Sequence, residues 1–155
     1  MSKHAKILEL IASCDDEIKL RNWIANANRE GVEEVEDAAR RRLIELRASK
    51  DVDDPSDPIV LDFWKSISAL EQELSDERGK TIRLSRTRQK IARVGVEKTL
   101  TDLALQPQPS EGYHLLRERG VLDLSAEAVV LRFPERFGEG VLEAARKRLD
   151  SDTFQ

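Results

Sequence analysis

The chain has 155 residues, a formal net charge of −4 and one cysteine, Cys14, so an internal disulfide is excluded. Charged residues make up 36% and apolar residues 39% of the chain, with few glycines and prolines. This composition is typical of a folded helical protein and argues against disorder and against a uniformly basic nucleic-acid coat. Because no signal-peptide-like or bilayer-length apolar run is present, we expect a cytoplasmic protein that makes no contact with membranes.

Residues 1–48 predict an N-terminal subdomain of three helices. Apolar side chains recur at intervals of three and four residues from Lys3 to Ser13, after Asp16, and from Val32 to Ala48. Asp15 or Asp16 is expected to cap the second helix, because a short side-chain oxygen accepts hydrogen bonds from the exposed N–H groups at a helix start. Gly31 is expected to end that helix in the left-handed conformation.

Residues 49–58 predict a polar linker between two halves, because this stretch holds two prolines and lacks apolar periodicity. Asp57 followed by Pro58 is a favourable helix start. The next helix, to about Glu77, carries apolar residues at alternating intervals of three and four: Val60, Phe63, Ile67, Leu70 and Leu74. This heptad rhythm lasts about two heptads. It favours packing within the chain, and the alternative is a homodimer seam through Phe63, Ile67, Leu70 and Leu74.

Residues 59–150, which include this helix, predict a C-terminal domain of helices separated by glycine and proline. Ser85 is expected to cap a helix that runs to Val94 and ends at Gly95. Further helices are expected at 97–105, at 110–119, after a cap at Ser125, and at 138–149. The fold class predicted for the whole chain is all-α, a compact array of about seven to eight short helices.

Charge is distributed unevenly along the chain. Residues 49–77, the acidic segment, hold nine acidic and two basic side chains, whereas residues 78–98, the basic segment, hold eight basic and one acidic. The two segments could neutralise each other in the fold, or they could give the surface two opposite faces.

Within the basic segment, helical geometry gathers cations on one side. At about 100° per residue, Arg83, Arg86, Lys90 and Arg93 fall within an arc of roughly 80°. The apolar residues Leu84, Ile91 and Val94 fall on an adjoining arc and are expected to anchor the helix. Arginine offers a planar fork of donors that suits phosphate, so the pattern predicts a nucleic-acid-binding face, extended by Lys80 and Lys98.

The function predicted from these features is that of a non-catalytic module that binds nucleic acid, with the DNA backbone favoured over RNA, as an accessory or regulatory factor. The alternative is a protein-interaction or oligomerisation module whose basic face docks on an acidic partner surface. No catalytic motif, phosphate loop or metal-ligand cluster is recognisable in the sequence. We therefore expect no cofactor and no metal and favour a non-catalytic protein, with an enzyme that lacks any recognisable motif as the least favoured alternative.

Overall fold

Helices account for all the regular secondary structure in the computed structural model, which describes residues 4–52 and 56–153. Over these residues the chain forms nine α-helices and two short 3₁₀ helices, without a strand. The all-α prediction is confirmed, with one or two more helices than expected. The chain divides into two units, residues 1–51 and 52–155. The division into a subdomain at 1–48 and a domain at 59–150 remains a prediction.

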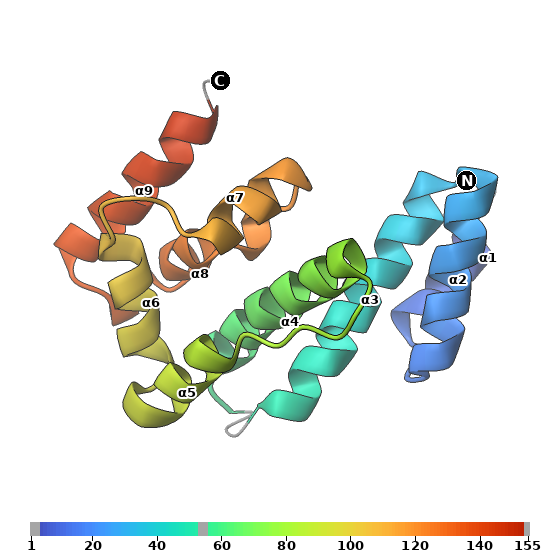
Figure 1. The fold of residues 1–155 in the computed structure, drawn as a ribbon, viewed down its shortest axis with the longest axis horizontal. Helices are drawn as coiled ribbons and strands as arrows, with labels where there is room; N and C mark the ends of the chain where they lie inside the picture. The colour runs from blue at the N-terminus through green and yellow to red at the C-terminus, as the bar shows by residue number, and fades with distance from the viewer. Residues whose placement is uncertain (1–3, 53–55, 154–155) are drawn as a thin grey trace. The chain divides into compact units, whose positions relative to one another are not determined.

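The first unit contains α1 (Ala5–Ala12), α2 (Glu17–Glu30) and α3 (Glu33–Asp51). Helices α2 and α3 form a hairpin, and α1 packs against α3 (Figure 1). The Asp16 side chain accepts from the N–H of Ile18 at 2.9 Å and so caps α2 as predicted. Gly31 ends α2 with φ of 72°, which a residue with a side chain rarely adopts. The buried core comprises Ile11, Cys14, Leu20, Ile24, Ala27, Val35, Ala39 and Leu43.

Helix α3 continues through Ser49, Lys50 and Asp51, three residues that the sequence places in the linker. None of the three is a helix breaker, and the Lys50 ammonium lies 3.1 Å from the Glu17 carboxylate of α2. Partial burial acts to raise the pKa of Glu17, but the hydrogen bond from Lys50 and the charges of the neighbouring Arg47, Lys50 and Arg21 lower it overall. Of the predicted linker, residues 53–55 lie outside the described residues.

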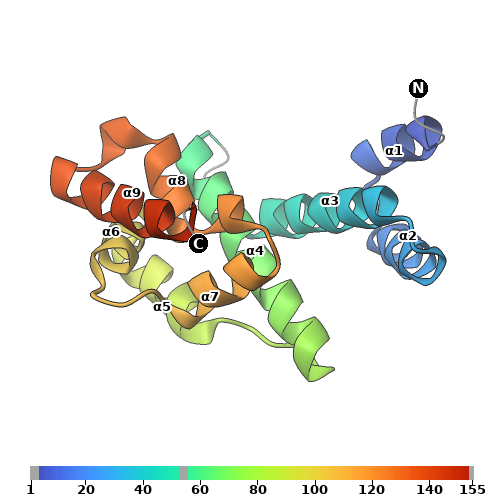
Figure 2. The ribbon, with the colours of Figure 1, turned by 90° about the horizontal axis from the view of Figure 1, so that it is seen from above.

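The second unit contains six α-helices and two 3₁₀ turns. They are α4 (Pro58–Arg78), α5 (Ser85–Val94), α6 (Val96–Leu105), α7 (Glu111–Glu118), α8 (Ala126–Arg132) and α9 (Glu139–Thr153), with 3₁₀ turns at Leu122–Leu124 and Pro134–Arg136. Helix α8 packs against α4, α6 and α9, and α7 packs against α4 (Figure 2). The side chain of Ser125 caps α8 as predicted, and the side chain of Ser110 caps α7.

The heptad residues of α4 face the interior of the second unit. Phe63 and Ile67 are buried and border a cavity of about 120 Å³, together with Tyr113 and Leu116 of α7. Leu70 packs so closely on Gly112 that a Cβ added there would lie 3.0 Å from a leucine methyl group. Leu74 is half-buried. These contacts favour packing within the chain over a dimer seam.

An ion-pair cluster joins the start of α4 to distant parts of the same unit. Asp57 caps α4 through the Ile59 N–H at 3.2 Å, and its two carboxylate oxygens each lie 3.0 Å from the Arg136 guanidinium. Arg136 also donates to Glu97 of α6. The hydrogen bond from Arg136 is the main reason that the pKa of Asp57 is lowered.

We expect this cluster to make stability depend on pH in acid. Because folding lowers the pKa of Asp57 from 3.8, its contribution is complete above that value and is lost as pH falls through the folded-state pKa. The free energy of unfolding, measured by urea denaturation from about pH 6 to pH 2.5, should therefore fall. Arg136→Gln should reduce this loss while leaving the part due to Asp102 and Glu17, whose pKa values are also lowered. An equal loss in both proteins would contradict the prediction.

Candidate nucleic-acid interface

The chain between α4 and α5 is fastened along α4. After Gly79, with φ of 68°, it doubles back beside α4 (Figure 1). The Ile82 N–H donates to Ser75 Oγ at 2.8 Å, and the Leu84 N–H donates to a Glu71 carboxylate oxygen at 2.8 Å. Ile82 and Leu84 are half-buried, whereas Arg83 between them is exposed. Arg83 is therefore held towards solvent by an extended segment.

Two details of the predicted basic helix are wrong. Ser85 does not cap α5: Leu84 occupies the N-cap position, and the acceptor for its N–H is Glu71, which belongs to another helix. Arg83 consequently precedes α5 and does not share its helical arc. The cations aligned on α5 itself are Arg86, Lys90 and Arg93, at intervals of four and three residues.

Arg88 attaches α5 to α4. Its guanidinium donates to both oxygens of Glu71, at 2.7 and 2.6 Å, and lies 5.1 Å from the centre of the Trp64 ring. Sequence reasoning missed this residue, although a signal was present: Arg88 falls four residues after Leu84 and three before Ile91, on the apolar face of the helix. A cation on such a face is expected to have a charged partner.

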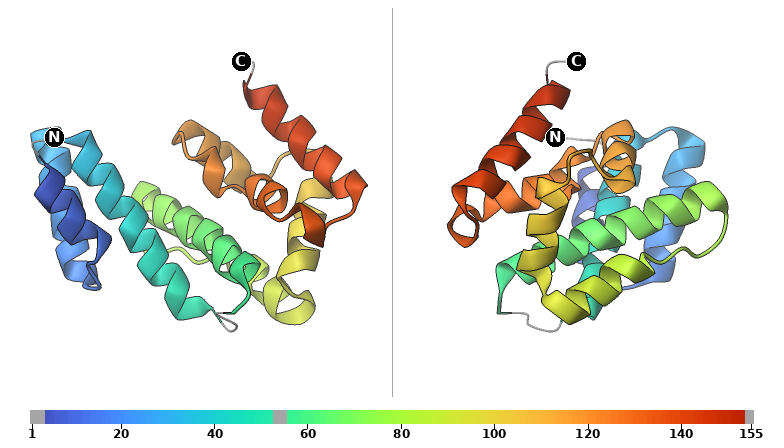
Figure 3. Two further views of the ribbon diagram at one scale, coloured as in Figure 1. Left: turned by 180° about the vertical axis from the view of Figure 1, so that it is seen from behind. Right: turned by 60° about the vertical axis from the view of Figure 1, so that its left-hand side comes forward.

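The apolar anchor of α5 is weaker than predicted. Leu84 borders the internal cavity and Ile91 is half-buried, but Val94 is 41% exposed. Val94 lies only about 40° around the helix from Lys90, and so nearer to the cationic side than to the centre of the apolar face. No residue within α5 is fully buried. The helix lies at the edge of the second unit (Figure 3). It is held there mainly by Arg88, Leu84 and the corner at Gly95.

The six predicted phosphate ligands fall into two groups. Lys90 and Lys98 both contact Asp102 of α6, with nitrogen–oxygen distances of 2.6 and 3.0 Å. These two hydrogen bonds, the stronger from Lys90, lower the pKa of Asp102. The other four cations are exposed and form no ion pair with residues 4–52 or 56–153. We call them the cationic strip: Lys80, Arg83, Arg86 and Arg93.

Within the described residues of the acidic segment, no carboxylate forms an ion pair with the cationic strip. Four of these carboxylates pair instead with arginines elsewhere in the second unit: Asp57 with Arg136, Asp62 with Arg132, Glu73 with Arg119 and Glu71 with Arg88. Three of these four arginines lie beyond the basic segment. The fold thus uses distant arginines to neutralise α4 and leaves the strip facing solvent.

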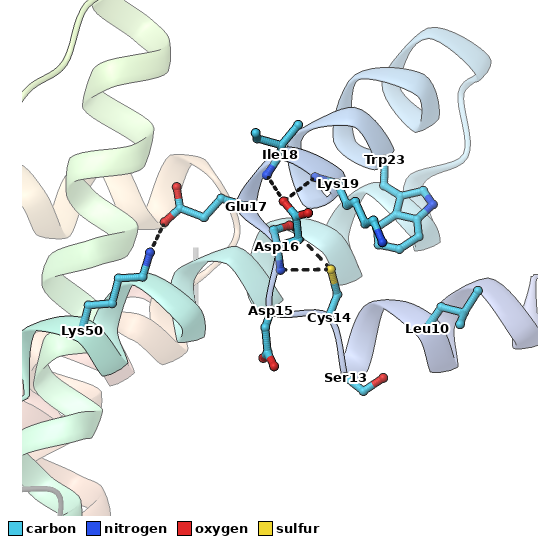
Figure 4. A pocket seen from close by; sticks show the side chains of 10 residues that line it. All are labelled: Leu10, Ser13, Cys14, Asp15, Asp16, Glu17, Ile18, Lys19, Trp23 and Lys50. Atoms are coloured by element: carbon cyan, nitrogen blue, oxygen red, sulfur yellow. Dashed lines mark hydrogen bonds and ion pairs between the residues drawn. The ribbon is translucent and has the colours of Figure 1, made fainter.

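A second concave surface lies in the first unit, with a volume of about 750 Å³ (Figure 4). Several of its polar groups already have partners: Glu17 binds Lys50, Asp16 caps α2, and the Cys14 thiol contacts the carbonyl oxygen and the N–H of Asp16. Leu10 and Ile18 are exposed at its edge. The polar side chains that have these partners therefore serve the fold of the first unit.

Within the described ranges, no group of three or more His, Cys, Asp or Glu side chains is arranged to hold a metal ion. None of the helices described is both long and apolar enough to cross a bilayer. No protein-family model, no curated protein and no solved structure matches this chain, so the candidate function is argued from the cationic strip itself.

Proposed function

We propose that the protein binds the sugar–phosphate backbone of duplex nucleic acid, DNA in the first place, through the cationic strip. The observation that carries the proposal is that an acidic protein leaves four cations exposed and without ion-pair partners in the described residues, within one stretch of 14 positions. Paired cations serve the fold, whereas these four are available to a ligand. Phosphate groups are the natural partners of such a row of arginines.

The dimensions of the strip suit a nucleic-acid backbone. Lys80 to Arg86 spans at most about 20 Å of extended chain, and Arg86 to Arg93 spans about 10 Å along α5. The strip is therefore at most about 30 Å long, within one turn of a DNA duplex, about 34 Å. The ring of Trp64 is covered by Arg88 and is not free to stack on a base. Binding should therefore depend on backbone phosphates, with weak sequence preference.

A protein that binds the nucleic-acid backbone in this way would act as a non-catalytic accessory or regulatory factor. The competing proposal is an interaction module whose cationic strip docks on an acidic protein surface. The same exposed arginines support both, since carboxylates and phosphates accept the same charge-assisted hydrogen bonds. The two proposals differ in whether nucleic acid alone is bound at low salt.

Salt-titrated fluorescence anisotropy with a labelled duplex of arbitrary sequence tests the proposal. Four phosphate contacts, each contributing about −0.9, give a slope of log affinity against log salt of about −3.6. Arg83→Ala, Arg86→Ala and Arg93→Ala together leave Lys80, so the slope should flatten to about −0.9. The fold should be retained, because all three side chains are exposed.

The matched control replaces three exposed lysines outside the strip, Lys6, Lys19 and Lys147, by alanine. It removes the same net charge and should leave the slope unchanged. If both triple variants weaken binding equally, the effect is one of total charge and the strip is not the site. If the wild type binds neither DNA nor RNA at low salt, the docking of an acidic protein surface becomes the first proposal.

A further inference from the structure

Asp102 lies where two helices meet beside the cationic strip. Helices α5 and α6 are joined by Gly95 alone, with φ of 88° and ψ of 169°, a backbone conformation that is essentially restricted to glycine. The resulting corner (Figure 3) brings Lys90 of α5 within 2.6 Å of Asp102 on α6. Lys98, one turn before Asp102 on the same helix, lies 3.0 Å from its other oxygen.

Lys90 occupies the middle of the row of cations on α5. It follows Arg86 by four residues and precedes Arg93 by three, so all three project from one face of the helix. Arg86 and Arg93 have no ion-pair partner in the described residues, whereas Lys90 is held by a carboxylate from the neighbouring helix. A phosphate that approaches this face meets two available arginines with a neutralised lysine between them.

We infer that Asp102 limits the affinity of this surface for nucleic acid by withholding Lys90 and Lys98 from the phosphates. The inference rests on the proposed function. A phosphate that binds Lys90 must either displace a carboxylate that is already within hydrogen-bond distance or share the ammonium with it. In either case the negative charge of Asp102, which then keeps only Lys98 as a full partner, lies beside the bound phosphate and opposes its binding. Its presence thus sets the number of bound phosphates at about four, although six cations of the basic segment are predicted to bind phosphate.

Asp102→Asn tests the inference, because asparagine keeps the shape and one acceptor oxygen but removes the charge. The slope of log affinity against log salt should steepen from about −3.6 to between about −4.5, if Lys90 alone is released, and about −5.4, if Lys98 follows. At about 0.1 M salt the affinity should rise about tenfold for each additional phosphate that the surface binds. Glu143→Gln, an exposed change of the same charge on α9, should leave the slope as it is.

Lys90→Ala in two backgrounds separates this mechanism from a general charge effect. In the wild type, where Asp102 holds Lys90, the change should leave the slope unaltered. In Asp102→Asn, it should flatten the slope by about 0.9. Circular dichroism and the thermal midpoint check the fold of each variant, since the Lys90–Asp102 pair also spans the corner at Gly95. The comparison of Lys90→Ala with the wild type does not depend on how well Asp102→Asn folds.

The outcomes distinguish this inference from the proposed function. Should the wild type bind DNA while Asp102→Asn shows the same affinity and slope, the inference is wrong and the proposed function stands. If Lys90→Ala flattens the slope of the wild type by about 0.9, the inference is overturned in the same way, because Lys90 would already bind phosphate. If neither the wild type nor Asp102→Asn binds, the proposed function fails and the inference fails with it.

Discussion

Replacing Ile67 by aspartate is expected to unfold the second unit. Ile67 is 2% exposed and borders a cavity that is also lined by the aromatic ring of Tyr113. A carboxylate there has no cationic partner and would cost about 4 kcal/mol or more, a large part of the stability of an ordinary domain. Circular dichroism should show loss of the helices of this unit, and urea titration of any folded fraction should give a much lower midpoint.

The same substitution at an exposed position is the control. Ile18 is 69% exposed in the first turn of α2, where the helix dipole favours a negative charge. Ile18→Asp should therefore change the free energy of unfolding by no more than about 0.5 kcal/mol. The molecular mass of wild type and Ile67→Asp, measured by light scattering, distinguishes packing within the chain from a dimer seam. If Ile67→Asp is a folded monomer where the wild type is a dimer, the heptad residues form a seam between copies and our interpretation of α4 is wrong.

Arg88→Ala is expected to release α5 from α4. The change removes both hydrogen bonds to Glu71 and the contact with Trp64, and it leaves a carboxylate that is 13% exposed without its cation. Breaking a fully buried pair costs about 3–5 kcal/mol. Because this pair retains some solvent contact, we expect a loss of about 2–3 kcal/mol in the free energy of unfolding of the second unit.

Trp64 reports on this loss directly. In a Trp23→Phe background, its fluorescence should change at a lower urea concentration in Arg88→Ala than in the parent. Arg86→Ala, two residues away on the exposed side of the same helix, should change stability by no more than about 0.5 kcal/mol. Equal effects of the two alanine variants would show that Arg88 is not what fastens α5. Arg88→Ala should also weaken DNA binding, although Arg88 is not part of the cationic strip, because it positions α5.

The parts of the fold that the sequence predicted correctly depend on local interactions. Asp16 and Ser125 each cap the helix that follows within three residues of chain, and Asp57 with Pro58 starts α4 in the same way. Local hydrogen bonds of this kind depend on the residue and its immediate neighbours, so the sequence carries the information. Where the prediction failed, at the start of α5, the acceptor was Glu71, 13 residues upstream on another helix.

The candidate site was predictable in composition but not in pairing. The clustering of cations in the basic segment is visible in the sequence, and four of the six named residues are exposed without ion-pair partners among the residues described. Lys90 meets Asp102 only because Gly95 sets the corner between α5 and α6. Likewise, Arg132 reaches Asp62 across 70 residues of chain. Tertiary geometry decides which cations remain available.

The absence of any fully buried side chain in α5 has a consequence for the order in which the molecule opens. Local unfolding is least costly where few apolar contacts are lost, so the backbone amides of α5 should exchange with deuterium before those of α4, which buries Ile59, Phe63 and Ile67. Helix α5, which is proposed to bind the ligand, is then also expected to unfold locally before α4. A bound ligand would slow exchange most in α5, and part of its binding free energy would be spent on ordering that helix.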